Sequence, residues 1–182
     1  MNELALRIAV IVGSTRVGRV GDGVAAWFVG AAKARGDVLV DLVDLVDFDF
    51  PVRLPEQATG EMDRFTATIR HADGFVVVTP EYNRSFPASL KQAIDYAYDE
   101  WHAKPVGFVC YGCGSLGHHA AAALRVVFAE LHTVTVRDEV AVDLMTAEPG
   151  PAHEAAATVL LDELVWWGQA LRAARAARPY VA

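Results

Sequence analysis

Hydrophobic residues along this chain follow two alternating patterns, short mainly apolar runs and longer stretches with helical spacing. The first run, residues 6–12, is suited to a strand that is covered on both faces, and the β-branched run at residues 75–78 indicates another buried strand. The five predicted strands occupy residues 6–12, 38–45, 74–79, 105–111 and 132–142. Between them, apolar residues recur every three or four positions, which predicts helices. These helices fall at residues 20–35, 61–71, 87–98 and 118–131, with a long final helix from residue 151. The alternation indicates an α/β fold, a doubly wound sandwich with helices on both faces of a parallel sheet.

The order of strands in this sheet is restricted, because right-handed crossovers leave few topologies. The flavodoxin-like order 2-1-3-4-5 places its switch point between the first and third strands. Open α/β sheets bind ligands at the carboxyl edge at such a point, so the loops after these two strands are expected to form a site. The sequence contains no internal repeat, low-complexity tract or linker, and residues 1–182 are expected to form a single domain.

Composition and charge narrow the possible partners. The chain has 182 residues, 53% hydrophobic and 21% charged, with a formal net charge of −7. A negative protein repels phosphate backbones, so a nucleic-acid partner is not expected. No apolar run approaches the roughly 18 residues that a membrane span needs. Residues 1–6 lack the basic start and small-residue cleavage site of a signal peptide. We therefore expect no membrane segment and a cytoplasmic location.

The loop after the first strand, residues 13–19, has the sequence GSTRVGR. The Ser14 hydroxyl, the Arg16 and Arg19 guanidinium groups and the positive end of the next helix dipole can all interact with a phosphate. The spacing fits neither the GxGxxG dinucleotide fingerprint nor a P-loop, which favours the phosphate of a mononucleotide. The alternative is an ordinary strand-to-helix turn with solvated arginines.

Residues 79–96, TPEYNRSFPASLKQAIDY, hold the loop after the third strand and the helix that Pro87 opens. This loop provides backbone N–H groups, an amide side chain and an aromatic ring at the same edge of the sheet. Its candidate binding residues are Pro80, Glu81, Tyr82 and Asn83. The alternative is a proline-stabilised turn in which Tyr82 packs on a neighbour.

A third loop, residues 112–117, follows the fourth strand and contains three glycines. Glycine permits close approach of the backbone to a planar ligand. The candidate binding residues here are Gly112, Gly114, Ser115 and Gly117.

The three loops and the helices after them resemble the NAD(P)H-dependent FMN reductase family, which includes quinone, chromate and azo-dye reductases. The resemblance covers most of the chain, and the motifs occur in the family's order. It implies noncovalently bound FMN, with Ser14, Arg16 and Arg19 as phosphate ligands, although relatives often carry serine or asparagine at the position of Arg19. The other two loops would surround the isoalloxazine ring, and Glu81 would act mainly through its backbone.

The same resemblance implies a reaction in which NADPH or NADH passes hydride to flavin N5. The nicotinamide then leaves, and a small-molecule electron acceptor takes the place of the nicotinamide. Quinones, azo dyes, nitroaromatics, metal oxyanions and free flavin are all acceptors within the family. FMN carries this chemistry, so no catalytic acid or base is expected. A homodimer or homotetramer is also implied, with Tyr82 and Arg84 as candidates for the subunit contact.

Two other functions remain open at this point. A flavodoxin-like electron carrier would bind FMN without NAD(P)H activity of its own, although the phosphate loops of such carriers are typically rich in serine and threonine. A binding or regulatory domain of the same fold would have no redox role.

Cys110 and Cys113 form a CxxC pair, with His118 and His119 nearby. A thioredoxin-like dithiol normally precedes a helix directly, whereas a glycine loop intervenes here. A redox role for the pair and a zinc site are therefore both disfavoured, and no metal site is expected. We expect Cys110 to be a small core residue and Cys113 to be partly exposed. FMN reductases usually have glycine at the position of His118.

Overall fold

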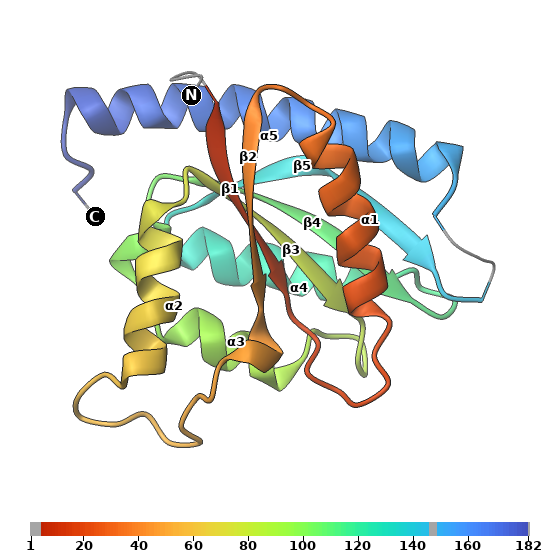
Figure 1. Ribbon diagram of the computed structural model, residues 1–182, viewed down its shortest axis with the longest axis horizontal. Coiled ribbons are helices and arrows are strands. Elements are labelled where there is room, and N and C mark those ends of the chain that lie inside the picture. The colour runs from red at the N-terminus through yellow and green to blue at the C-terminus, as the bar shows by residue number, and fades with distance from the viewer. Residues whose placement is uncertain (1–4, 146–148, 182) are drawn as a thin grey trace.

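The structure, a computed structural model that describes residues 5–145 and 149–181, is built on one five-stranded sheet (Figure 1). Its strands are β1 (Leu6–Val12), β2 (Val38–Asp44), β3 (Gly74–Pro80), β4 (Pro105–Gly112) and β5 (Val134–Asp143). All pairs are parallel and the order is β2-β1-β3-β4-β5. The predicted fold class is thus confirmed. The signal-peptide expectation concerned residues 1–6, of which the first four lie outside the described residues.

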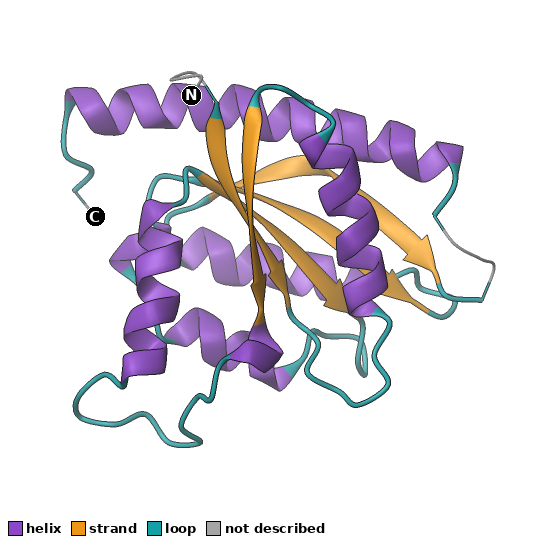
Figure 2. Cartoon of the chain, in the orientation of Figure 1, coloured by secondary structure: helices purple, strands orange, loops and turns teal. Residues whose placement is uncertain are grey.

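Helices cover both faces of the sheet (Figure 2). One face carries α1 (Gly21–Lys33) and α5 (Pro151–Ala177). The other carries α2 (Gly60–His71), α3 (Ala88–Asp95) and α4 (His118–Glu130). Two short 3₁₀ helices, η1 (Leu45–Asp47) and η2 (Asp99–Trp101), follow β2 and α3.

Two apolar cores hold these layers together, because successive strand residues point to opposite faces. Val10 and Val76 belong to the core beneath α1 and α5, whereas Ile11 and Val77 belong to the core beneath α2, α3 and α4. Every residue of β3 and of β4 is buried. Each large side chain buried in this way contributes about 1.5–3 kcal/mol. The cores therefore fix the strand ends from which the loops of the site emerge.

Several element ends differ from the sequence prediction by one to three residues, and two of them have a visible cause. The fifth strand begins at Val134 and not at residue 132, because His132 has a φ of 55° and the Thr133 hydroxyl donates to the Phe128 carbonyl at the end of α4. The third helix ends at Asp95, and the residues expected to continue it lead into η2.

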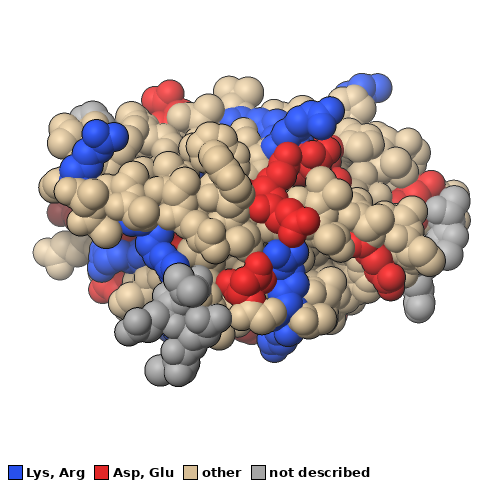
Figure 3. Space-filling view, turned by 90° about the horizontal axis from the view of Figure 1, so that it is seen from above, with Lys and Arg blue, Asp and Glu red and all other residues tan. Residues whose placement is uncertain are grey.

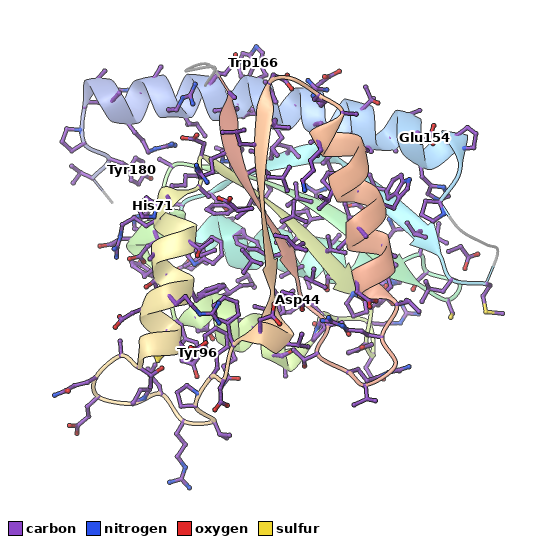
Figure 4. The ribbon with its side chains drawn as sticks, viewed as in Figure 1. Asp44, His71, Tyr96, Glu154, Trp166 and Tyr180 are labelled. Atoms are coloured by element: carbon purple, nitrogen blue, oxygen red, sulfur yellow. The ribbon has the colours of Figure 1, made fainter. Side chains whose placement is uncertain are left out.

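Two properties of the described surface bear on the expected partners, the apolarity of its helices and its charge distribution. Among the residues that the structure describes, no helix is long and apolar enough to cross a bilayer. Acidic and basic side chains lie interspersed among uncharged ones on the face shown in Figure 3. Trp166, on the outer side of α5 in Figure 4, packs edge to face on Trp167 with ring centroids 4.9 Å apart.

Candidate active site

Three loops at the carboxyl edge of the sheet enclose a cavity of about 360 Å³. These are the loops after β1, β3 and β4, toward the lower right of Figure 1. The volume lies within the range of ligand-binding clefts, about 300–1,000 Å³. The cavity is lined by Ser14, Arg16, Gly18, Arg19, Val20, Pro80, Glu81, Tyr82, Tyr111, Gly112, Cys113, Ser115 and Leu144.

Three of the candidate residues do not line this cavity: Asn83, Gly114 and Gly117. Asn83 has a φ of 51° and lies in the tight turn closed by backbone bonds between Tyr82 and Ser85. Gly117 has a φ of 91°, and a Cβ there would lie 2.5 Å from the backbone nitrogen of Tyr111. Gly117 is therefore required for close packing of the loop on β4. Direct binding roles for these three residues stay predictions.

Arg19 is held by a carboxylate that the sequence pattern did not single out. Its guanidinium forms a two-point ion pair with Asp44, and Nη1 lies 2.6 Å from Oδ1. The same Nη1 donates to the Ser14 carbonyl oxygen at 2.7 Å. Asp44 lies at the end of β2, close to the loop after β1 (Figure 4). In this arrangement Arg19 fastens the loop, and most of its charge is matched by Asp44.

Because Asp44 matches most of the Arg19 charge, the positive potential at the cavity comes from Arg16 and from the start of α1. Arg16 is exposed at the cavity, and it has no ion pair among the described residues. The N-cap of α1 is Val20, which provides no side-chain hydrogen bond. The first N–H groups of α1 therefore lack a side-chain acceptor and can bind an anion.

Tyr111 adds a hydrogen-bond donor that sequence reasoning missed. Its side chain is 2% exposed, and its hydroxyl makes no hydrogen bond of normal geometry among the described residues, although the nearby Ser14 side chain acts to lower its pKa. A Cβ at Gly21, the first residue of α1, would overlap this hydroxyl, so the oxygen lies at the start of the helix. Burial raises the pKa of Tyr111 well above its usual value, which keeps the proton on the oxygen. An orphaned buried donor beside an open helix N-terminus suits a phosphate. The adjoining Gly112 was the only sequence signal that pointed to this position.

Two loops meet through a hydrogen bond between Ser14 Oγ and Tyr82 Oη, which are 3.0 Å apart. The backbone of the loop after β3 is already largely paired. The Glu81 N–H donates to the Tyr111 carbonyl, and the Tyr82 N–H donates to Ser85. The Asn83 side chain, in contrast, is exposed. A direct contact between Asn83 and a ligand stays a prediction, because Asn83 does not line the cavity.

The Glu81 carboxylate joins the second loop to α4. It accepts the backbone N–H of His119 at 3.1 Å and contacts His119 Nδ1 at 3.1 Å. Arg84 Nη1 lies 2.8 Å from His119 Nε2, and arginine can only donate. His119 therefore accepts at Nε2 and donates from Nδ1 to Glu81. Burial alone would raise the pKa of Glu81, but hydrogen bonds from Ser115 and His119 bring it below its usual value. A carboxylate so engaged is a structural group, and the expected role of the Glu81 backbone at the flavin stays a prediction.

A larger hollow of about 770 Å³ lies at the opposite edge of the sheet, but its polar groups are mostly paired. Arg70 lies 2.6 Å from Glu100, and Lys104 donates to the carbonyl oxygens of Ile69 and Arg70 at the end of α2. These contacts cap a helix, and the hollow lies away from the switch point. The cavity at the carboxyl edge is therefore the better candidate.

Comparison with known proteins identifies the family of this chain. Residues 6–147 match the family described as NADPH-dependent FMN reductase. The chain is 36% identical to the NAD(P)H-dependent FMN reductase ntnL of Nectria sp over 119 residues, which are 58% of this chain and 59% of that protein. It is 37% identical to a 2-hydroxy-1,4-benzoquinone reductase of Burkholderia sp over 142 residues, 72% of this chain and 74% of that protein.

A solved structure shows the same fold. The flavoenzyme NAD(P)H:(acceptor) oxidoreductase FerB from Paracoccus denitrificans superposes with a TM-score of 0.73 at 24% identity. The superposition covers 91% of this chain and 98% of FerB. The family match confirms the oxidoreductase class and the FMN cofactor expected from the sequence. The chain belongs to the NADPH-dependent FMN reductase family.

Proposed function

We propose that this protein transfers hydride from NADPH or NADH, through FMN held in the cavity at the carboxyl edge, to a small-molecule electron acceptor. The flavin supplies the redox chemistry when bound, because its ring accepts hydride at N5 and passes the electrons on. The protein supplies binding, orientation and electrostatics. The two relatives described above are named as an FMN reductase and a benzoquinone reductase, which supports a quinone or a flavin as acceptor.

The observation that carries this proposal is the unpaired Tyr111 hydroxyl at the open start of α1. A phosphate there accepts hydrogen bonds from Tyr111, from Ser14 and from the first N–H groups of the helix. Arg16 supplies a charge at the rim of the cavity, and Arg19 holds the loop through Asp44. The chemistry of this donor set fits the phosphate end of FMN.

The remaining loops provide the place for the flavin ring. Tyr82 and Gly112 line the cavity on the loops after β3 and β4, and Asn83 lies in the turn next to Tyr82. Among the described residues that line the cavity, Glu81 is the only acidic one, and its carboxylate is bound to His119. No general acid or base is needed for hydride transfer between the nicotinamide and flavin rings, which agrees with this arrangement.

The extent of the domain and the oligomeric state of the protein are part of the same proposal. We propose that residues 1–182 form one FMN-binding domain and that the protein assembles as a homodimer or homotetramer. Tyr82 and Arg84 remain candidates for the contact between subunits. A cytoplasmic location also stays a prediction.

The proposal is tested by measuring NADH and NADPH oxidation by the purified FMN-loaded protein, with and without a quinone. A reductase turns over repeatedly and needs the acceptor. An electron carrier stays nearly inert when no partner protein is present. A domain without a redox role does not bind FMN, so titration of the flavin-free protein with FMN shows no saturation. Arg16→Ala, compared with Arg53→Ala in an exposed loop away from the cavity, links any activity to the site.

A further inference from the structure

We propose that Cys110, His118 and Glu139 form a zinc-binding site behind the glycine loop. Their donor atoms, one sulfur, one imidazole nitrogen and one carboxylate oxygen, all lie within 4.8 Å of one another. Zinc is bound in proteins by these three donor types. The site uses neither Cys113 nor His119, and it does not depend on the flavin function proposed above.

The backbone brings His118 onto Cys110 through the tight turn at Gly117. A Cβ at Gly117 would lie 2.8 Å from the Cβ of Cys110, so the two backbones are in direct contact. Gly117 adopts the left-handed region with a φ of 91°, and α4 begins at the next residue. The first side chain of α4 therefore stands over the thiol.

Glu139 enters from the neighbouring strand. It pairs in register with Phe108 of β4, two residues before Cys110, so its side chain lies on the same face as the thiol. A register shift between Val106 and Phe108 moves β5 along its partner and sets Glu139 at this position. Irregularities of this kind often redirect a side chain toward a functional site.

The carboxylate is already oriented as a ligand. Glu139 Oε1 lies 2.7 Å from His118 Nδ1, and Oε2 lies 3.0 Å from Arg125 Nη2. Arg125 is itself fixed, because it donates to the carbonyl oxygens of Val136 and Arg137. A metal ion can take Oε1 while Arg125 keeps Oε2. Such outer partners orient ligands and tune the affinity of metal sites.

The distances require only a small adjustment. Around a tetrahedral zinc ion, donors are separated by roughly 3.3–3.6 Å, given bonds of about 2.0–2.3 Å. The Nδ1 and Oε1 atoms must therefore move apart slightly, and Sγ must approach by at most about 1 Å. The His118 side chain is 54% exposed, which leaves a path from solvent. The fourth position is then open to water.

Zinc replaces the thiol proton of Cys110 on binding. The S–H bond breaks, a Zn–S bond forms, and one proton passes to solvent. The His118 proton moves from Nδ1 to Nε2 with no net release. One thiolate and one carboxylate then bind the ion, while Arg125 stays paired with Oε2 of the carboxylate.

Isothermal titration of the FMN-loaded, chelator-treated protein with zinc chloride tests this proposal. We expect one zinc ion per chain. Cys110→Ala, His118→Ala and Glu139→Gln should each raise the zinc Kd by at least about tenfold. Cys113→Ala and His119→Ala, the matched cysteine and histidine controls, should leave the zinc Kd unchanged.

Cobalt substitution reads the ligand set directly. Wild-type protein should show a thiolate-to-cobalt charge-transfer band that Cys110→Ala lacks and Cys113→Ala retains. Absence of saturable zinc binding overturns the proposal. So does zinc binding that survives the Cys110 and Glu139 changes, because the ion then occupies another site. The flavin content of each variant, measured in parallel, keeps this result separate from the fate of the proposed reductase function.

Discussion

Replacing Tyr111 by phenylalanine changes one hydroxyl group and should move stability and cofactor affinity in opposite directions. In the flavin-free protein the hydroxyl is buried without a partner, an arrangement that costs about 1–3 kcal/mol. Its removal should therefore raise the free energy of unfolding by up to that amount. In the complex the same hydroxyl donates to a phosphate, and a hydrogen bond to a charged group contributes about 1.5–3 kcal/mol. Its loss should weaken FMN binding by about 10- to 150-fold.

The assay is a fluorescence titration of flavin-free wild type and Tyr111→Phe with FMN and with riboflavin. Riboflavin lacks the phosphate, so its Kd should be the same for both proteins. Urea unfolding of the flavin-free proteins measures the stability change. An unchanged Kd for FMN would refute the reasoning. An equal loss for FMN and riboflavin would place the hydroxyl at the ring and not at the phosphate.

Three further predictions follow from the same contacts. Gly21→Ala should weaken FMN binding and lower the unfolding free energy, because the new Cβ overlaps the Tyr111 hydroxyl. Adding Tyr111→Phe should restore the unfolding free energy. If the two changes in unfolding free energy simply add in the double variant, the overlap is contradicted. Asp44→Asn should lower the unfolding free energy by about 1–3 kcal/mol, measured by urea unfolding, since it breaks the partly buried pair with Arg19; no change would show that the pair is solvated. Burial, and next the charge of Arg175, lowers the pKa of Lys104 to about 8 from its usual 10.5. Between these two pKa values the unfolded chain binds more protons than the folded protein, so the unfolding free energy should rise with pH from about 8 to about 10.5. Urea unfolding at these two pH values measures the rise, and Lys104→Met should flatten it.

Hydrophobic periodicity was sufficient to predict the fold, because the central strands are short apolar runs and apolar residues recur with helical spacing between the strands. The central strands are buried on both faces, which removes the ambiguity of alternating patterns. The ends of elements were harder to predict. The end of α4 depends on the left-handed backbone of His132 and on a hydroxyl that caps Phe128, and neither is visible in a hydrophobic pattern.

The candidate site was predicted as a set of loops but not as a set of contacts. Loop motifs located Ser14, Arg16 and Tyr82, since glycine, proline and hydroxyl residues mark turns. The partner of Arg19 lies 25 residues away at the end of β2, and only the fold brings the two together. Tyr111 looks like an ordinary strand residue in the sequence. Its importance depends on a missing hydrogen bond, which only three-dimensional structure can show.

The most direct test of the central claim is a crystal structure of this protein with FMN. We expect the phosphate at the start of α1, within hydrogen-bonding distance of the Tyr111 hydroxyl and Ser14, and the ring between the loops after β3 and β4. Flavin bound at another edge of the sheet, or a phosphate that lies beyond hydrogen-bonding distance of the Tyr111 hydroxyl, would contradict the account.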